Sequence, residues 1–405
     1  MNPNPMPRWH AAAAILLVLC LFVPAAAAGS WVTETVSPSD PEPIAADISG
    51  SHVVYSVAYG EAINLSTPRG LLLYDADTGR TTTIANASGQ MTLTGGEIAG
   101  DAVVWFEEPQ GFTREPTGLN NSILLFSLAT STTTAIRTSP SAEWPKTDGH
   151  RIIWSETPGD TYITSLSLYD IAAKTTGALP VHPEDGASVV LDSDTIAFRD
   201  ANTSALSLYD IPSQQSTAVT DPIHTNTTDT MVDAYALGGD VLLYKTRIVE
   251  YSPPNRGITN ILTRYSVKNK TNVTLSPITG RVVENPTADD LKASFDSLFT
   301  DGETISWVVE TGISESVVIT VSAETGDVSR LEIDGDVAFP SVDGSRATWV
   351  QSKMFKNAHL VLAAWQDSAA AGNTTGPVAE TTSAPGFGIL CAAGALAVVS
   401  LGRKK

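Results

Sequence analysis

A short hydrophobic block that follows a turn and ends in an aromatic residue recurs along the chain. Residues 50–55 (GSHVVY) and 100–105 (GDAVVW) show the pattern, in which Gly and a polar residue precede the apolar side chains. The block occurs seven times, 42 to 63 positions apart, with the aromatic residues Tyr55, Trp105, Trp154, Phe198, Tyr244, Trp307 and Trp349. A recurrence of this period indicates a repeat architecture in which each unit is one small supersecondary structure.

Each repeat carries further strand signals besides this block. A leucine-rich segment such as 71–75 follows it, then a turn such as 77–79 and a threonine-rich segment such as 81–84. The stretch before the block, for example 91–98, supplies a fourth strand. Four strands in about 45 residues are typical of one propeller blade. We predict an all-β fold, a seven-bladed β-propeller of four-stranded blades over residues 29–365, with a pair of β-sandwiches as the alternative.

The hydrophobic blocks are apolar on both faces of their strands, as residues 103–105 (VVW) illustrate. A strand that lies between two neighbouring layers needs this pattern, whereas a sheet with one wet face alternates. The last repeat is one strand short, because only 359–363 is an obvious strand after Trp349. The isolated segment 31–36 would complete the last blade and remove its open edge.

One interval between repeats contains a helical signal. Thr287 and Asp290 have the spacing of a capping box. The apolar residues that follow at helical spacing are Leu291, Phe295, Leu298 and Phe299. We predict a short helical insertion over residues 287–299, packed on a blade edge, with a lid or a partner-docking helix as the alternative.

Both ends of the chain carry apolar segments outside the repeats. Residues 1–28 are typical of a secretory signal peptide, with a basic Arg8, an apolar run over 11–23 and small residues at 26–28. An uncleaved membrane anchor is the alternative for this end. Residues 366–384 are rich in Thr, Ala and Gly and are predicted to be a flexible stalk.

The last segment, residues 385–405, begins with Pro385, Gly386 and Phe387, continues with a short apolar run and ends in three basic residues. It resembles the PGF-CTERM sorting signal of archaeal surface proteins. That resemblance implies recognition by an archaeosortase-type processing enzyme, which removes the tail and replaces it with a lipid anchor. An ordinary transmembrane span of about 22 Å is the alternative. Both readings place the protein at the cell surface, on the extracellular face of the membrane. The resemblance further implies association with the cell envelope and its S-layer.

The repeat itself resembles the Tol-like and YVTN-type propellers of archaeal surface proteins. The shared pieces are the block ending in Trp, as in 100–105, and the L-Y-D strand followed by T-G, as in 71–79. The resemblance covers residues 48–363. It implies a propeller fold and brings no catalytic residues with it.

Composition and charge exclude several classes of protein and of binding partner. The chain is 42% hydrophobic and 17% charged, which allows an ordinary core and excludes global disorder. Its 44 acidic and 24 basic residues give a net charge of −20, which disfavours nucleic acid as a partner. The two cysteines, Cys20 and Cys391, lie in the terminal segments, so the body contains no disulfide, cysteine-based zinc site or thiol nucleophile.

Eight N-x-[ST] sequons accompany the predicted export. We predict possible glycosylation at Asn64, Asn86, Asn120, Asn202, Asn226, Asn269, Asn272 and Asn373.

Linear motifs for chemistry are absent from the sequence. It contains no P-loop, dinucleotide-binding fingerprint or G-x-S-x-G segment, and the histidines form no metal-binding spacing. The acidic segments 75–79, 192–194 and 334–336 resemble incomplete calcium loops and are predicted to be hairpin turns. We therefore predict no cofactor, no metal ligand and no catalytic residue. Calcium at the propeller centre and a carboxylate pair drawn from distant blades remain open alternatives.

Two functions of different classes follow. The first is a non-enzymatic surface module for binding, adhesion or envelope structure, with an unknown protein or glycan ligand. The second is a surface hydrolase or lyase that acts on polysaccharide or peptide at the propeller mouth. Envelope transport, implied by the Tol-like resemblance alone, is a third. Two or three inward-facing His, Arg or carboxylate groups in the central funnel would favour the enzyme, and a lining of Thr, Ser and Ala would favour the binding module.

Overall fold

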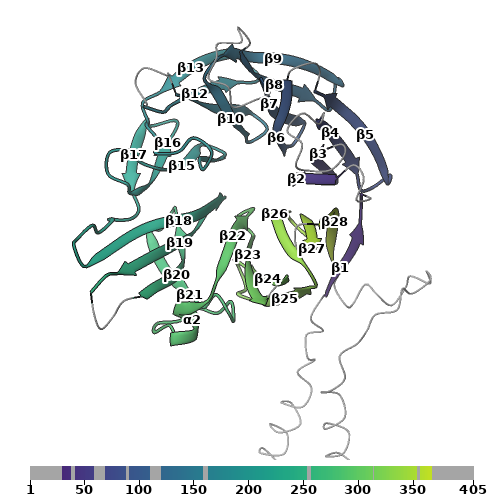
Figure 1. Ribbon diagram of the computed structural model, residues 1–405. Helices are drawn as coiled ribbons and strands as arrows, with labels where there is room; N and C mark the ends of the chain where they lie inside the picture. The colour runs from purple at the N-terminus through teal and green to yellow at the C-terminus, as the bar shows by residue number, and fades with distance from the viewer. Residues whose placement is uncertain are drawn as a thin grey trace, which may run out of the picture. The chain divides into compact units, whose positions relative to one another are not determined.

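The computed structural model describes residues 30–37, 42–58, 69–87, 91–109, 120–157, 163–252, 257–312, 314–353 and 356–366. The predicted signal peptide and sorting tail, and all of the stalk except Gln366, lie outside these ranges. Within them the strands form seven antiparallel sheets of four strands each, arranged as blades in a ring (Figure 1). The predicted fold class, an all-β seven-bladed propeller, is confirmed.

Each blade is built from four strands in order from the centre outward. The first strands line the centre: β2 (Glu42–Ser49), β6 (Met91–Ala99), β10 (Ala142–Thr147), β14 (Val190–Asp192), β18 (Thr228–Gly238), β22 (Phe295–Thr300) and β26 (Asp336–Asp343). The second strands are β3 (His52–Ala58), β7 (Ala102–Pro109), β11 (Arg151–Glu156), β15 (Thr195–Arg199), β19 (Val241–Glu250), β23 (Thr304–Gly312) and β27 (Arg346–Lys353). The third strands are β4 (Arg69–Asp75), β8 (Asn121–Ser127), β12 (Ser165–Asp170), β16 (Leu206–Asp210), β20 (Gly257–Ser266), β24 (Glu315–Ser322) and β28 (Lys356–Gln366). The outer strands are β5 (Arg80–Asn86), β9 (Thr132–Ser139), β13 (Thr175–Leu179), β17 (Gln215–Ala218), β21 (Thr271–Leu275), β25 (Val328–Ile333) and β1 (Ser30–Thr35).

The second strands carry the core on both of their faces. In β7, Val103 and Trp105 pack in a cluster with residues of the preceding blade, such as Val54. Val104 and Phe106 of the same strand pack against the following blade, in a cluster with Trp154. Alternate side chains point to opposite faces of a strand, so a continuous apolar run fills two interfaces at once. Each buried aliphatic side chain of this kind contributes about 1.5–3 kcal/mol relative to an exposed one.

Tight turns join the first and second strands and tie neighbouring blades together. The backbone N–H of Gly100 donates to Ser49 Oγ of the preceding blade at 3.0 Å. The Gly239 N–H donates to Asp192 Oδ2 in the same way at 2.9 Å. The φ angles of these glycines, 53° and 51°, lie in the left-handed region, where a side chain is strained. This conformation explains why Gly recurs at the turn, although Ser193 adopts it in the fourth blade, with a φ angle of 50°.

The N-terminal strand β1 completes the last blade, as the sequence predicts. It pairs antiparallel with β28 from Ser30 opposite Gln366 to Thr35 opposite Val361. Trp31 and Trp365 meet edge to face across this pair, with ring centroids 5.5 Å apart. Strand β1 runs beside β28 in Figure 1, so the ring is closed by two segments far apart in the sequence.

The predicted helical insertion over residues 287–299 is wrong beyond its first turn. The helix α2 covers only Ala288–Lys292, with Thr287 as N-cap and the predicted capping box to Asp290. Phe295–Thr300 is the first strand of the sixth blade, β22. Phe295 and Phe299 are both buried, but the bulge between Asp296 and Phe299 breaks the alternation of the strand. Phe295 packs in a cluster with Trp307, and Phe299 packs in the cluster of the next blade with Trp349.

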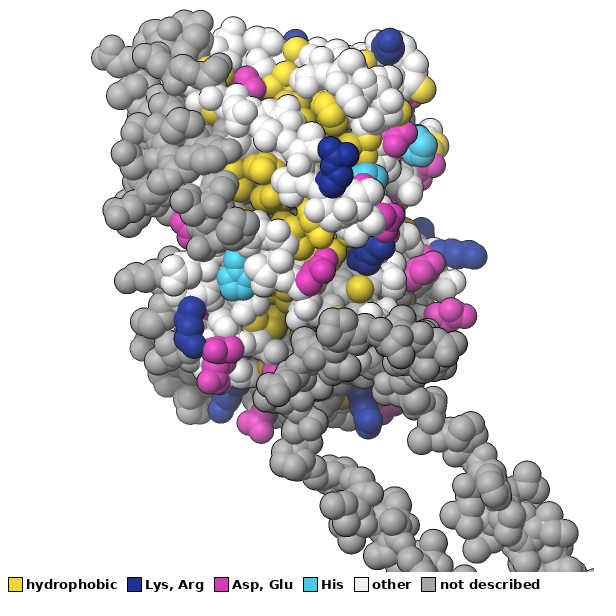
Figure 2. Space-filling view, turned by 90° about the vertical axis from the view of Figure 1, so that its right-hand side faces the viewer, with side chains coloured by type: hydrophobic (Ala, Val, Ile, Leu, Met, Phe, Trp, Pro, Cys, Tyr) yellow, Lys and Arg dark blue, Asp and Glu magenta, His cyan; other side chains and the backbone are white. Residues whose placement is uncertain are grey.

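Charged side chains of both signs are interspersed on the side of the molecule shown in Figure 2. The acidic surplus therefore marks no single continuous acidic patch on that side. Within the described residues, no helix is long and apolar enough to cross a membrane.

Candidate functional site

The first strands of the blades are distorted at matching places. Six of the seven, all except β14, lose register with their second strand part-way along. The shifts lie between Pro43 and Ala45, Thr94 and Glu97, Glu143 and Lys146, Val232 and Ala234, Asp296 and Phe299, and Ala338 and Ser341. Bulges of this kind re-aim side chains and are common beside active sites.

These distorted strands enclose a cavity of about 670 Å³ at the centre of the ring, lined by residues from all seven blades. Its volume falls in the range of small-molecule sites, about 300–1,000 Å³. Asp47, Glu97 and Lys146 are the charged residues of its lining within the described part of the chain. We call these three residues the channel triad.

The channel triad comes from three consecutive blades at one position of the repeat. Each member stands three positions before the turn residue of its blade, which is Gly50, Gly100 or Gly149. The equivalent residues of the other four blades are Val190, Ala236, Phe299 and Ser341. One wall of the cavity is therefore charged, and most of the opposite wall is apolar.

Asp47 is held in place by groups from three blades. Ser341 Oγ donates to its Oδ1 at 2.6 Å. The backbone N–H of Ile98 donates to its Oδ2 at 2.8 Å. The N–H of Ile48 donates to Oδ1 at 3.0 Å. Because these bonds come from separate sheets, the orientation of the carboxylate is set by the closed ring.

Glu97 and Lys146 form an ion pair across the boundary of the second and third blades, with Lys146 Nζ donating to Glu97 Oε1. The Glu97 and Lys146 side chains are 29% and 25% exposed, so both are reached by solvent although they lie inside the ring. Among the described residues, Lys146 is the hydrogen-bond partner of the Glu97 carboxylate.

The surroundings shift the protonation of all three groups. Burial raises the pKa of Asp47, although its hydrogen bonds and the charge of Lys146 act in the opposite direction. Burial likewise raises the pKa of Glu97 against the pull of Lys146. Burial alone would lower the pKa of Lys146, but the charge and hydrogen bond of Glu97 and the charge of Asp47 raise it overall. Two carboxyl groups whose pKa values are raised, beside a lysine, can carry out acid–base chemistry.

Two aromatic residues stand at the bulges beside the channel triad. Trp144 and Phe339 line the cavity and remain 38% and 56% exposed. Trp144 is braced by Phe106, edge to face, with ring centroids 5.3 Å apart.

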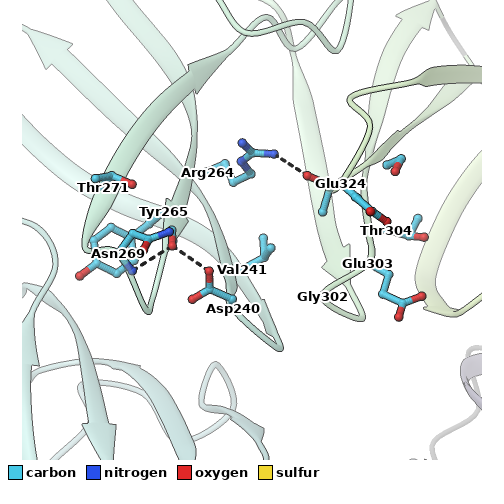
Figure 3. A pocket seen from close by; sticks show the side chains of 13 residues that line it. Asp240, Val241, Arg264, Tyr265, Asn269, Thr271, Gly302, Glu303, Thr304 and Glu324 are labelled. Atoms are coloured by element: carbon cyan, nitrogen blue, oxygen red, sulfur yellow. Dashed lines mark hydrogen bonds between the residues drawn. The ribbon is translucent and has the colours of Figure 1, made fainter.

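A second cavity, of about 620 Å³, lies between the fifth and sixth blades (Figure 3). Its polar groups are engaged in the local structure: Ser266 Oγ donates to Asp240 Oδ2 at 2.8 Å, and Arg264 Nη1 donates to the Ala323 carbonyl at 3.3 Å. Asn269, one of the predicted glycosylation sites, lines this cavity. These bonds brace two turns, so this cavity is a weaker candidate than the central one.

The residues singled out from the sequence lie elsewhere. The seven repeat aromatics are on second strands and are buried, between 0% and 5% exposed. The described sequon asparagines are exposed: Asn86, Asn120, Asn202, Asn226, Asn269 and Asn272. Asn64, Asn373 and the motif Pro385, Gly386 and Phe387 lie outside the described residues.

The acidic turns use their carboxylates for local bonds. Asp75 accepts a hydrogen bond from the Asp77 N–H at 2.9 Å, as a hairpin turn requires. Ion pairs occupy the others: Asp77 with Arg346 at 2.9 Å, Asp194 with Arg151 at 2.6 Å and Asp334 with Lys353 at 2.9 Å. Within the described residues, no three His, Cys, Asp or Glu side chains are grouped closely enough to hold a metal ion.

The channel triad is absent from the sequence-based site prediction. A signal for it exists, because aligning the seven repeats on their turn residue places Asp47, Glu97 and Lys146 in one column. Three charges in the column of a strand that lines a ring indicate side chains that converge on the centre.

No protein-family model and no curated protein matches the chain. Solved structures share its fold. The β-propeller domain of the trilobed protease from Pyrococcus furiosus aligns over 79% of this chain and 94% of its own, with a TM-score of 0.52 and 9% identity. The acylaminoacyl peptidase of Pyrococcus horikoshii aligns over 79% of this chain and 50% of its own, with a TM-score of 0.52 and 10% identity. Oligogalacturonate lyase from Vibrio parahaemolyticus aligns over 83% and 97%, with a TM-score of 0.50 and 12% identity.

These likenesses confirm the propeller part of the resemblance stated from the sequence, and they correct the prediction that the chain is not an enzyme. The same fold forms nearly all of a lyase and a domain of two peptidases. Propeller architecture without a linear catalytic motif is therefore compatible with catalysis. At 9–12% identity the likenesses show the fold alone. The evidence for function lies in the central cavity of this chain.

Proposed function

We propose that this protein is a hydrolase acting on polysaccharide or peptide in the central cavity of the propeller, with the channel triad as its acid–base machinery. One observation carries the proposal: two carboxyl groups and a lysine from three consecutive blades converge on one cavity. Inward-facing carboxylates in the central funnel are also the feature that we expect of an enzyme and not of a binding module.

The roles follow from the surroundings of each group. Glu97, with its raised pKa, donates a proton to the leaving oxygen or nitrogen. Asp47, oriented by Ser341 and the Ile98 N–H, accepts a proton from the attacking water. The hydroxyl of that water forms the new bond to the electrophilic carbon as the old bond breaks. Lys146 stabilises the negative charge left on Glu97.

The charge of the cavity favours hydrolysis over elimination. A lyase that acts on uronic acids must neutralise the substrate carboxylate before it can remove the neighbouring proton. Lys146 is the one basic residue of the described lining, and it is already paired with Glu97. An anionic substrate would therefore find no free cation in the described lining to neutralise its carboxylate.

The test is a substrate screen in which the wild type is compared with an inactivated variant. Wild-type protein and the double variant Asp47→Asn/Glu97→Gln are incubated with neutral polysaccharides, polyuronates and peptide libraries, and new reducing ends and free amines are measured. We expect hydrolysis by the wild type and loss of it in the double variant, with unchanged circular dichroism. Turnover that persists in the double variant would move the active site away from the channel triad, and unsaturated products would identify a lyase.

The location of this activity is a proposal that rests on the two chain ends. The signal-like segment 1–28 and the PGF-CTERM-like segment 385–405 support an exported enzyme tethered at the cell surface and processed by an archaeosortase-type enzyme. Such an enzyme would meet the polymers of its own envelope or of the surroundings.

A further inference from the structure

The backbone at Trp144 and Phe339 is unfavourable for the residues that stand there. Their φ angles are 54° and 51°, in the left-handed region that bulky side chains seldom adopt. Each is also followed by proline, Pro145 or Pro340, which restricts the preceding residue to extended conformations. Backbone strain of this kind persists where the surrounding structure imposes it and clusters at ligand sites.

The matching positions of two other blades use residues that tolerate this backbone better. Counting five residues back from the turn glycine gives Trp144, Phe339, Gly95 and Ser297, all with positive φ. At a positive φ, Gly95 has no side chain to be strained, and the small side chain of Ser297 is strained less than a bulky aromatic one. The bulge therefore does not require a large aromatic residue at this position. The rings of Trp144 and Phe339 need another explanation.

The two rings flank the acid–base groups. Trp144 stands two residues before Lys146, and Phe339 stands two residues before Ser341, which holds Asp47. Asp47 and Glu97 belong to the two blades between them, since the blades of Phe339, Asp47, Glu97 and Trp144 follow one another around the ring. A chain that crosses the cavity from the seventh blade to the third would meet Phe339, then the carboxylates, then Trp144.

The charges on this side of the ring offer no counter-charge to an anionic chain. Lys146 is the one cation of the described lining, and it is paired with Glu97. The other charged residue of that lining, Asp47, is a carboxyl group. A polyuronate would therefore find no free cation for its carboxylates.

We infer that Trp144 and Phe339 are stacking platforms for the rings of a neutral carbohydrate chain, held so that a glycosidic bond lies over Asp47 and Glu97. The faces of neutral pyranose rings are apolar C–H surfaces that fit on exposed aromatic rings, and their hydroxyls donate to carboxylates. This inference rests on the proposed hydrolase for the reaction, and on the two aromatic residues for the substrate class.

The test measures binding apart from turnover. The Asp47→Asn/Glu97→Gln protein is titrated by calorimetry with hexasaccharides of glucose (β-1,4 and α-1,4), xylose, mannose and N-acetylglucosamine. We expect one or more of these neutral hexasaccharides to bind. Hexagalacturonate is titrated into the wild type, in which Glu97 still pairs with Lys146, and should not bind. Trp144→Gly and Phe339→Gly, each made in the double-variant background, should weaken binding of the neutral hexasaccharides by about tenfold or more. Ile258→Ala, at a residue that is 56% exposed on β20, is the control that should leave binding unchanged.

Glycine is chosen because it accepts a positive φ, so these variants should keep or raise the melting temperature while losing affinity. A purely structural role for the rings predicts the reverse, a lower melting temperature with unchanged affinity. Absence of binding to every neutral hexasaccharide, or binding that is indifferent to both glycine variants, overturns the inference. Binding through the two rings without any hydrolysis by the wild type would refute the proposed reaction and leave the carbohydrate platform standing. Peptide hydrolysis that needs Glu97 and not Trp144 would support the proposed reaction and refute the carbohydrate platform.

Discussion

Asp47, Glu97 and Lys146 give the cavity its chemistry through their different surroundings. Asp47 is fixed by Ser341 and by the Ile98 N–H, so its position depends on the ring being closed. Glu97 is held by the flexible chain of Lys146, which leaves it freer to follow a leaving group. One group that is fixed and one that can adjust suit a base and an acid, respectively.

The pH dependence of activity should report both carboxyl groups. The pKa of Asp47 and that of Glu97 are raised by burial, so both limbs of a bell-shaped kcat/KM profile should lie above the ordinary values of 3.8 and 4.5. Activity should rise as Asp47 loses its proton and fall at higher pH as Glu97 loses its proton. The profile is measured with the substrate found in the screen.

Ser341→Ala gives this prediction a specific control. The Ser341 hydroxyl lowers the pKa of Asp47, so its removal should move the acid limb to higher pH and leave the alkaline limb in place. A uniform loss of activity with an unmoved profile would mean that Asp47 is not the titrating base.

At the scale of elements, the repeat pattern was sufficient to predict the blades, because second strands fill two interfaces and therefore show uninterrupted apolar runs. The strand that completes the last blade was also predictable, since the last repeat lacks one and β1 is otherwise unpaired. The segment after Lys292 was not, because a bulge in β22 interrupts the alternation of the strand and leaves Phe295 and Phe299 at a helical spacing. The bulges were hidden for a similar reason: local sequence does not show where two strands lose register.

Asp290 is predicted to stabilise the junction between the fifth and sixth blades. Its carboxylate accepts from the Thr287 N–H at 2.9 Å, from Thr287 Oγ1 at 2.7 Å and from Ser276 Oγ. Asp290→Ala removes the reciprocal half of the capping box and leaves the O–H of the buried Ser276 without its acceptor, so we expect a loss of about 1–3 kcal/mol of unfolding free energy.

The pH dependence of the stability difference between wild type and Asp290→Ala tests whether the hydrogen bonds of the carboxylate cause it. Although burial acts to raise the pKa of Asp290, its hydrogen bonds outweigh that effect and lower it below 3.8. A depressed pKa contributes stability that is present above the unfolded value and is lost as pH falls through the folded value. Denaturant melts should therefore show a wild-type advantage at neutral pH that shrinks below pH 3.8. An advantage that stays constant at acid pH would point to packing instead.

At the scale of the whole molecule, closure of the ring determines both stability and the site. Asp47 receives bonds from the first, second and seventh blades, and β1 completes the seventh. The sequence could not show this convergence, because Asp47 and Ser341 become neighbours only when the chain returns to its start. Their common repeat position was visible, and their contact required the fold.

Removing residues 30–35 should therefore weaken the whole protein. The deletion exposes the outer edge of β28 and removes the contact of Trp31 with Trp365. We expect a lower melting temperature and association through the open edge, measured by calorimetry and light scattering. Truncation after Gln366, which leaves both strands intact, is the matched control. A deletion variant as stable as that control would show that closure by β1 is dispensable.

The proposed surface location has its own test. Intact-mass and peptide analysis of protein from its native membrane should show a chain that begins near residue 29, lacks the segment after Pro385 and carries lipid. The same peptide analysis should find glycans on exposed sequons, including Asn86 and Asn202. Retention of residues 403–405 would instead favour an ordinary membrane span.

The most direct measurement of the central claim, that the channel is an active site, is the kcat/KM of Glu97→Gln beside Asp334→Asn on the hydrolysed substrate. Asp334 is a matched acidic residue on an exposed turn, 77% exposed and paired with Lys353. We predict a loss of about 10²–10⁴-fold for Glu97→Gln and no loss for Asp334→Asn, with both variants folded. Equal activity of the two variants and the wild type would contradict the claim and place any catalysis outside the channel triad.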